Sequence, residues 1–254
     1  IIMIKLNVKT NTKQYNILIG SKLISSLSFL LRKNSIDFNK CLIVIDKNVP
    51  KNFIKKILKS LNNKTKIFHF IHANEKNKNQ KNVNQILEKL LKNNFHRNDC
   101  LISVGGGITG DVLGFASSLF KRGIKFVNIP TTLLAMVDAS IGGKNGVDLG
   151  IIKNQIGVIN NPVMVLICKE FLNTLPKNQL KAGYAEVIKH GIIDSESYWD
   201  KIKIFNELNI DEIDAIIWES VLVKNNIITI DPFEKNIRKK LNYGHTLGHA
   251  IESY

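Results

Sequence analysis

The chain has 254 residues, 44% of them hydrophobic and 22% charged, which is typical of a soluble globular protein with one large or two ordinary domains. No apolar run is long enough to span a bilayer and the N-terminus lacks the regions of a signal peptide, so we expect no membrane association. The formal net charge of +15 comes almost entirely from dispersed lysines, with only four arginines, so we expect no nucleic-acid partner. Cys41, Cys100 and Cys168 have no metal-binding spacing, which favours the reducing cytoplasm.

Strand-like and helix-like segments alternate over the first two thirds of the chain. The predicted strands are residues 4–8, 15–19, 41–45, 66–71, 101–104 and 126–129. The predicted helices are residues 23–31, 49–61, 83–93 and 112–119. This order predicts an α/β domain over residues 1–172, with a Rossmann-like, mostly parallel sheet.

The pattern changes after residue 172 and becomes helical. Helices are predicted at residues 179–193, 211–230 and 241–254, and Asp231-Pro232 ends the second of them. We therefore expect an all-α domain over residues 173–254.

A glycine-rich turn follows the strand at residues 101–104. Gly105, Gly107 and Gly110 match the pattern G-x-G-x-x-G, between a strand and a helix. Glycine lets the backbone approach a ligand closely, and the first N–H groups of the helix point at any anion bound there. The turn therefore suggests a pyrophosphate site, although a purely structural turn has the same sequence.

Two further groups of residues carry charge. Lys144 and Lys153 flank the sequence GGKNGVDLGIIKNQIG, which we interpret as a glycine-rich loop that either captures an anion or is simply solvated. Glu186 and Lys189 lie one helical turn apart, which suggests an ion pair unless a ligand engages them.

His245 and His249 are spaced by one helical turn, which can place two imidazoles on a divalent metal. The glutamate that a zincin needs after the first histidine is replaced by Thr246, which argues against a zincin. Glu186, from another helix, is a candidate oxygen ligand for the same ion. Two histidines without a metal remain the alternative.

Four segments, taken together, identify a family. VGGGITGD, RGIKFVNIPTTLLAMVDASIGGKNGVD, AGYAEVIKHGII and LNYGHTLGHAIE occur in the order found in 3-dehydroquinate synthases, and the chain resembles that family from about Asp46 onward. The resemblance implies conversion of 3-deoxy-D-arabino-heptulosonate 7-phosphate to 3-dehydroquinate and phosphate, with catalytic NAD and Zn²⁺ or Co²⁺. It also implies a homodimer and a role in aromatic amino acid biosynthesis.

The resemblance assigns roles to individual residues. NAD contacts fall on Asp46, Lys47, Asn48, Glu75, Lys78, Gly106, Gly107, Ile108, Asp111, Thr131, Thr132, Lys144, Lys153, Phe171, Leu172, Asn173 and Thr174. Metal ligands fall on Glu186 and His245, and acid–base roles on Glu234 and His249. Substrate contacts fall on Arg122, from the partner subunit, and on Asp138, Lys144, Asn154, Lys189, Lys224, Arg238 and Asn242.

The sequence also departs from the family pattern. Ile152 replaces the usual glycine before a Lys-Asn pair, and the family's third metal histidine lies further along than Tyr254. We therefore expect the helical domain to be incomplete here. The alternatives are an inactive truncated remnant, a related sugar-phosphate cyclase or an iron-type polyol dehydrogenase.

Overall fold

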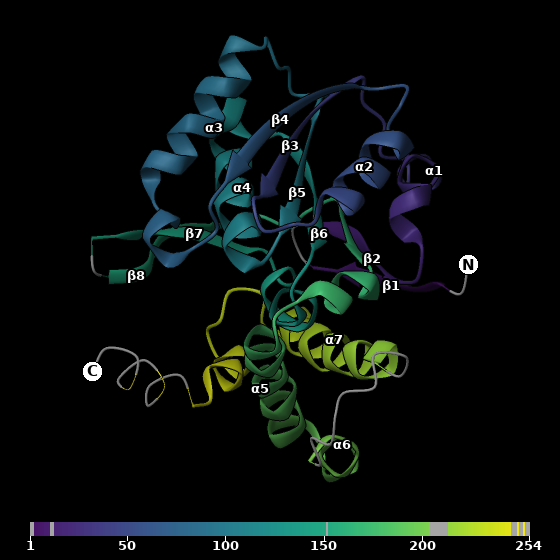
Figure 1. The fold of residues 1–254 in the computed structure, drawn as a ribbon. Coiled ribbons are helices and arrows are strands. Elements are labelled where there is room, and N and C mark those ends of the chain that lie inside the picture. Colours follow the sequence, from purple (N-terminus) through teal and green to yellow (C-terminus); the bar gives the residue numbers. More distant parts are fainter. Residues whose placement is uncertain are drawn as a thin grey trace.

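A seven-stranded sheet forms the centre of the molecule (Figure 1). The computed structural model describes residues 3–10, 13–150, 152–203, 213–244, 248 and 251. In spatial order the strands are β1 (Met3–Lys9), β2 (Gln14–Gly20), β9 (Met164–Ile167), β6 (Lys125–Pro130), β5 (Cys100–Gly105), β3 (Lys40–Asp46) and β4 (Thr65–Ile71). Within this sheet, as far as the structure describes it, only β1 and β2 pair antiparallel, so the prediction of a mostly parallel sheet is confirmed.

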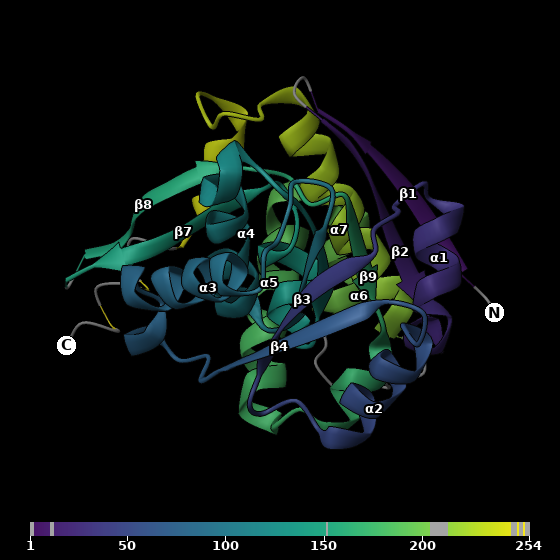
Figure 2. The ribbon, with the colours of Figure 1, turned by 90° about the horizontal axis from the view of Figure 1, so that it is seen from above.

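Alternation along the strands builds two hydrophobic layers. In β3, Cys41, Ile43 and Ile45 join one core cluster, whereas Leu42 and Val44 join the other. Helices α1 (Leu27–Lys33) and α2 (Lys51–Ser60) cover the first face, and α3 (Gln80–Lys92) and α4 (Gly107–Leu119) cover the second (Figure 2). Burial on both faces explains why β3 is apolar without a polar alternation.

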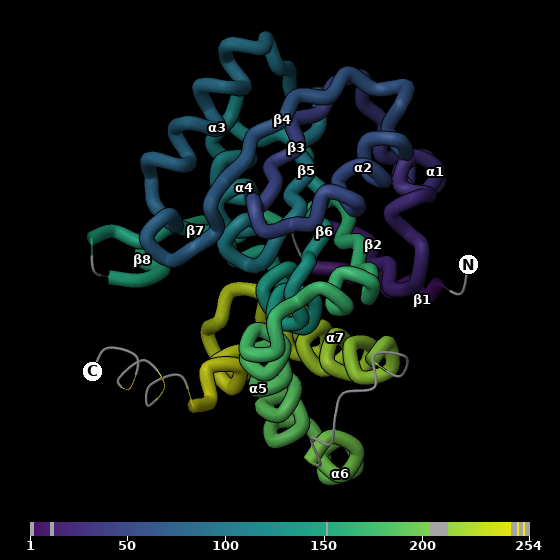
Figure 3. Tube along the Cα trace, in the orientation of Figure 1, coloured from purple at the N-terminus to yellow at the C-terminus, as the bar shows by residue number. Residues whose placement is uncertain are grey.

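The helical region packs at one end of the sheet (Figure 3). It contains α5 (Lys177–Asp194), α6 (Glu196–Ile202), α7 (Ile213–Ile230) and the 3₁₀ helix η6 (Ile237–Asn242). The π-helical turn η4 (Ala135–Ala139) follows β6 and packs against both α5 and α7. The carboxyl end of β6 therefore meets the helices there. Among the described helices, none has the length and apolar character needed to cross a bilayer.

The interpretation of residues 142–157 as a loop is wrong, because most of this segment forms a β-hairpin. Strands β7 (Lys144–Leu149) and β8 (Ile152–Ile159) pair antiparallel, with Gly146 opposite Gly157. A Cβ atom at Gly146 would lie 2.6 Å from the backbone oxygen of Ile156, so glycine permits the close pairing rather than a loose loop.

Other boundaries also differ from the predictions. Residues 23–31 divide between the 3₁₀ helix η1 (Leu23–Ser26) and α1, and α4 begins at Gly107 rather than residue 112. Strand β9 and helix α6 were not predicted, since each is short. The helix predicted at residues 241–254 falls mostly outside the described residues; Leu241 and Asn242 belong to η6.

Candidate active site

The glycine-rich turn forms a cradle at the carboxyl edge of the sheet. Strand β5 ends at Gly105, Gly106 caps α4, and α4 begins at Gly107, so the first N–H groups of this helix open onto the turn. A Cβ atom at Gly105 would collide with the Thr109 side chain, and one at Gly107 would lie 2.9 Å from the Ala139 Cβ. The turn therefore requires glycine, as an anion cradle does.

Several residues assigned to NAD converge on this turn. The Thr131 N–H donates to the Gly105 carbonyl at 2.9 Å, and Asp46, at the end of β3, accepts from the Asn48 N–H at 3.1 Å. A Cβ atom at Gly106 would lie 3.2 Å from Thr132 Cγ2. The ends of three parallel strands thus surround one cradle, which is where nucleotides bind in open α/β sheets.

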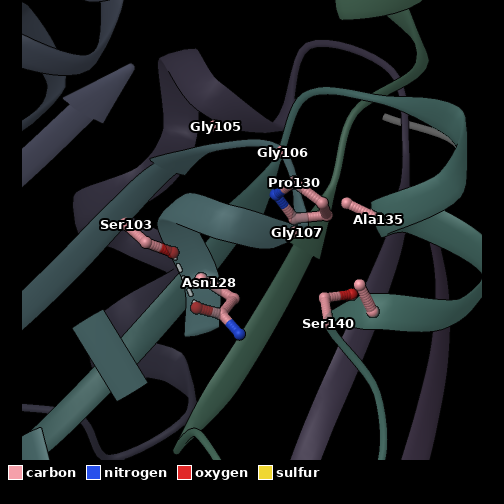
Figure 4. Close-up of a pocket in the computed structure, with 10 residues that line it drawn as sticks. Ser103, Gly105, Gly106, Gly107, Asn128, Pro130, Ala135 and Ser140 are labelled. Atoms are coloured by element: carbon pink, nitrogen blue, oxygen red, sulfur yellow. Dashed lines mark hydrogen bonds between the residues drawn. The ribbon is translucent and has the colours of Figure 1, made fainter. Parts of the chain in front are cut away.

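Ser103 and Asn128 form a polar floor beneath the turn. Neither residue was among the predicted site residues. The Ser103 hydroxyl hydrogen bonds the Asn128 side chain at 2.6 Å, and both residues are buried (Figure 4). They line a small hollow together with Gly105, Gly106, Gly107, Gly110, Pro130, Ala135, Ala139 and Ser140. Polar residues in the middle of otherwise apolar strands were the available signal.

Lys78 joins the turn to the hairpin. Its ammonium lies 2.7 Å from Asp111 Oδ2 and donates to Asn154 Oδ1 at 2.5 Å. Asn154 adopts a left-handed backbone with φ of 57°, and its N–H donates to Asp148 at 2.8 Å. Burial raises the pKa of Asp111 to about 6, against the opposing effect of Lys78.

The other residues assigned to NAD lie in different surroundings. Phe171 and Leu172, on the 3₁₀ helix η5 (Lys169–Thr174), are buried core residues, and the Phe171 ring packs 4.5 Å from that of Phe53. The side chains that remain on the surface are Lys47, Asn48, Glu75, Lys144, Lys153, Asn173 and Thr174. Ile108 is half-buried in the first turn of α4.

Five ionisable side chains meet where η4, α5 and α7 pack together. This buried charged cluster consists of Asp138 on η4, Glu186, Lys189 and His190 on α5, and Lys224 on α7. Lys224 pairs with the Asp138 carboxylate and donates to its backbone oxygen at 2.6 Å. Lys189 pairs with Glu186, as the spacing predicted, and donates to the Leu241 carbonyl at 2.6 Å.

Burial and neighbouring charges shift the pKa values in the cluster. Burial and the nearby Asp138 raise the pKa of Glu186. Burial favours a higher pKa for Asp138, but the charges of Lys224 and Lys189 outweigh burial, and the net pKa is lowered. Burial lowers the pKa of Lys224 and brings that of His190 to about 3, so the imidazole is neutral. Strongly shifted groups concentrated at one place are typical of a functional site.

The cluster contains donor atoms suited to a metal. Ligand atoms of Asp138, Glu186 and His190 lie within 4.8 Å of one another. Both nitrogens of His190 are buried without a hydrogen bond from the described residues, and Glu186 Oε1 is buried against the Lys189 ammonium. Carboxylate and imidazole donors fit Zn²⁺ or Co²⁺. His190 was not among the predicted site residues, although it follows Glu186 by one turn; His245 and His249 lie outside the described residues.

A second group of predicted residues bridges the hairpin and the loop after α7. Lys144 pairs with Glu234, and Asn242 donates to Glu234 Oε1 at 2.7 Å. Burial favours a higher pKa for Glu234, but the contacts with Lys144 and Asn242 outweigh it and lower the pKa. Glu234 is therefore a carboxylate at neutral pH. Arg238 is 2% exposed and donates to the carbonyls of Pro232 at 2.5 Å and Gly142 at 3.1 Å.

Arg122 lies away from these groups. It ends the 3₁₀ helix η3 (Phe120–Arg122), just beyond the carboxyl end of α4. Since α4 has 13 residues, its two ends lie about 20 Å apart at ~1.5 Å per residue. Arg122 is exposed and has a left-handed backbone with φ of 61°, as has Lys121 before it.

Comparison with known proteins agrees with this geometry. Family models for the N-terminal and C-terminal parts of 3-dehydroquinate synthase match residues 68–182 and 183–254. The 3-dehydroquinate synthase of Pelagibacter ubique is 50% identical over 99% of this chain and 69% of its own length. That of Bacillus mycoides is 36% identical over 98% of this chain and 70% of its own length.

Solved structures share the fold. A 2-deoxy-scyllo-inosose synthase with carbaglucose-6-phosphate, NAD⁺ and Co²⁺ has a TM-score of 0.88 at 24% identity and covers 98% of this chain and 69% of its own. A 2-epi-5-epi-valiolone synthase from Streptomyces hygroscopicus with NAD⁺ and Zn²⁺ has a TM-score of 0.78 at 23% identity, covering 94% of this chain and 68% of its own. The sequence matches decide between these relatives: this chain belongs to the 3-dehydroquinate synthase family.

Proposed function

We propose that this protein converts 3-deoxy-D-arabino-heptulosonate 7-phosphate to 3-dehydroquinate and phosphate, using catalytic NAD and Zn²⁺ or Co²⁺. The observation that carries the proposal is the 50% identity to a 3-dehydroquinate synthase over 99% of the chain. The substrate is an anionic sugar phosphate, and the reaction belongs to aromatic amino acid biosynthesis. The three free, buried cysteines agree with a cytoplasmic enzyme.

The glycine-rich turn would hold the pyrophosphate of NAD. The requirement for glycine at Gly105 and Gly107, and the opening of α4 onto the turn, support this assignment. Lys78 and Asp111 would close the site from the side of the hairpin through their 2.7 Å ion pair. Asp46 would receive the ribose hydroxyls at the end of β3, as carboxylates do in this class of fold.

Glu186 would bind the metal from α5, together with His245. Glu186 is buried, and Lys189 and His190, the described residues that approach its carboxylate, both face Oε1, so Oε2 is left for a ligand. When bound, NAD supplies reversible oxidation of a secondary alcohol and the metal supplies Lewis acidity toward an oxygen atom. The protein's own contribution is to orient the substrate between these two groups and to handle protons.

Cations of the site would recognise the two anionic ends of the substrate. Lys189 and Asn154 would bind the phosphate, and Lys144, Lys224 and Arg238 would bind the carboxylate. Each of the three lysines already pairs with a carboxylate of the protein. The pairs are Lys189 with Glu186, Lys144 with Glu234, and Lys224 with Asp138. These internal pairs keep the cations oriented, and substrate binding exchanges one carboxylate partner for another anion.

Proton transfer would fall to Glu234 and His249, with Asp138 accepting substrate hydroxyl groups. Glu234 is a carboxylate held by Lys144 and by the Asn242 amide at 2.7 Å, so it is ready to accept a proton. When Lys144 turns to the substrate, Glu234 loses a cation and becomes more basic.

Arg122 would act in the partner subunit of a homodimer. It lies at the far end of α4 from the glycine-rich turn and is exposed, so its own site is about 20 Å away by the length of that helix. A residue that belongs to the family's substrate motif but lies far from its own site supports a shared site between two copies.

The experiment is phosphate release from the heptulosonate phosphate by the purified protein with NAD and Zn²⁺ or Co²⁺. We expect phosphate and 3-dehydroquinate in equal amounts, without net NADH, because the cofactor is regenerated in each turnover. Glucose 6-phosphate, which has no carboxylate, is the control substrate and is expected to be inert. Phosphate release from glucose 6-phosphate alone, or stoichiometric NADH, would overturn the proposal.

A further inference from the structure

His190 belongs to the buried charged cluster, but no hydrogen bond from the described residues reaches its side chain. Its side chain is 0% exposed, and neither ring nitrogen has a hydrogen-bond partner among these residues. The four other members are paired, Lys224 with Asp138 and Lys189 with Glu186. Burying an imidazole without partners is costly, so its presence next to Glu186 calls for a function.

The geometry links His190 to one particular oxygen of Glu186. Nε2 of His190 lies 3.6 Å from Glu186 Oε1, just beyond hydrogen-bond distance, because the two residues are one turn apart on α5. Lys189 approaches the same oxygen. No hydrogen bond from the described residues reaches Oε2, which leaves that oxygen available to a ligand.

The surroundings also determine what His190 can do. His190 is fully buried, and a neutral imidazole carries one N–H donor and one acceptor nitrogen. A neutral donor can hold a carboxylate without competing for the charge that attracts a divalent ion. Such outer partners commonly fix the orientation of metal-binding carboxylates.

We propose that His190 is a positioning residue that donates a hydrogen bond from Nε2 to Glu186 Oε1 and so holds this carboxylate ready for the divalent metal. The inference rests on the proposed function, in which Glu186 is a metal ligand and Lys189 binds the substrate phosphate. When Lys189 leaves Glu186 for the phosphate, His190 remains as the donor on Oε1. The metal-binding carboxylate then keeps its orientation through the reaction.

Direct coordination is the competing role for His190. Its ligand atom lies within 4.8 Å of those of Asp138 and Glu186, which is close enough for all three to share one ion. A glutamine at position 190 distinguishes the positioning role from direct coordination. A glutamine in place of His190 can donate a hydrogen bond to Glu186, but it is a poor substitute for an imidazole on Zn²⁺ or Co²⁺.

The test is a Co²⁺ titration of the purified protein without substrate, followed by the visible absorption of the bound ion. We expect His190→Leu to weaken Co²⁺ binding about 10- to 100-fold, as the loss of an outer-shell partner does. His190→Gln should bind within about threefold of the unmodified protein, with the same absorption bands, because the donor is restored. His190→Met is a second variant without a donor, in case the leucine variant does not fold.

His69→Leu is the matched control. Nε2 of His69 is also buried without a hydrogen bond from the described residues, but His69 lies on β4, away from the cluster. Its replacement should leave the dissociation constant for Co²⁺ unchanged. Thermal unfolding of the metal-free variants separates a general loss of structure from a loss of metal affinity.

Three outcomes would overturn the inference, and they are distinguishable. Unchanged Co²⁺ affinity in His190→Leu and His190→Met would show that the imidazole does not support the site. A weak His190→Gln variant with altered absorption bands would assign direct coordination instead. Absence of Co²⁺ binding in the unmodified protein would remove the proposed metal site itself, and the positioning role with it.

Discussion

Lys78 holds two partners in the proposed NAD site, the Asp111 carboxylate at 2.7 Å and the Asn154 side-chain oxygen at 2.5 Å. Replacing it by methionine leaves the Asp111 charge buried without its cation, and we expect a loss of about 3 kcal/mol in the free energy of unfolding at pH 8. NAD affinity should fall at the same time. Chemical denaturation and calorimetric NAD titration measure the two effects.

Lys76→Met is the matched control for this prediction. Lys76 lies two residues earlier, in the 3₁₀ helix η2 (Glu75–Asn77), but is exposed and has no ion pair with any described residue. Its replacement should change stability by less than about 0.5 kcal/mol. Equal effects of the two substitutions would mean that the ion pair of Lys78 with Asp111 is not important.

Asp111 should make stability depend on pH in a defined direction. Its pKa rises from 3.8 to about 6 in the folded protein because of burial, so between these values the folded state holds the additional proton. The contribution of this group to stability therefore decreases as pH rises through that window, by up to about 3 kcal/mol. Asp111→Asn cannot titrate, so its stability relative to the unmodified protein should increase from pH 4 to pH 7.

Urea denaturation at several pH values measures this difference. Asp200→Asn provides the control, because the Asp200 side chain is 56% exposed. The stability curve of this control should run parallel to that of the unmodified protein. A parallel curve for Asp111→Asn as well would contradict the prediction.

At the scale of residues, local spacing predicted some contacts and missed others. Glu186 and Lys189 are three positions apart on a helix, and their ion pair follows from that spacing alone. The partnership of Lys224 with Asp138 joins residues 86 positions apart, so no local pattern could predict it. His190 was missed because a histidine within an apolar helix has many structural explanations.

The hairpin of β7 and β8 depends on two opposed glycines. Gly146→Ala would place a Cβ atom 2.6 Å from the Ile156 backbone oxygen, which forces the strands apart. We expect a loss of about 2–3 kcal/mol in the free energy of unfolding. NAD affinity should also decrease, because Asn154 on β8 holds Lys78.

Gly150→Ala is the control within the same hairpin. Gly150 has a φ of 61° and no atoms within 4 Å of an added Cβ, so only the cost of the left-handed backbone applies. That cost is about 1 kcal/mol. If chemical denaturation gives the same loss for both variants, close pairing of Gly146 with Gly157 is not what stabilises the hairpin.

At the scale of elements, apolar periodicity was informative and glycine was misleading. The buried strands β3 and β5 are short apolar runs, and both were predicted within one or two residues. The hairpin was interpreted as a loop because its three glycines, Gly146, Gly150 and Gly157, weaken any strand pattern. The glycines are explained only by the facing strand and its distance, which the sequence does not contain.

At the scale of the whole molecule, the sequence predicts the type of sheet, but it does not predict the order of the strands or the assembly of the site. The alternation of strands and helices led to the mostly parallel sheet, because parallel strands need crossover helices. The order of the seven strands, and the meeting of η4 with α5 and α7, come from packing between distant segments. The site residues were assigned by family resemblance, and the buried charged cluster shows that three distant elements bring several of them together.

A shared active site makes a prediction that only the whole dimer can test. Arg122→Gln and Lys224→Met should each abolish phosphate release, the first by removing the residue that each subunit is proposed to supply to its partner's site. When the two variants are coexpressed, half of the dimers are mixed and each mixed dimer has one complete site, so about a quarter of the normal activity should return. Arg97→Gln, at another exposed arginine, should remain fully active on its own. If coexpression restores no activity, the proposed homodimeric site would have to be abandoned. Arg122 would then serve its own subunit, and α4 and η3 would have to be repositioned by about the length of a helix.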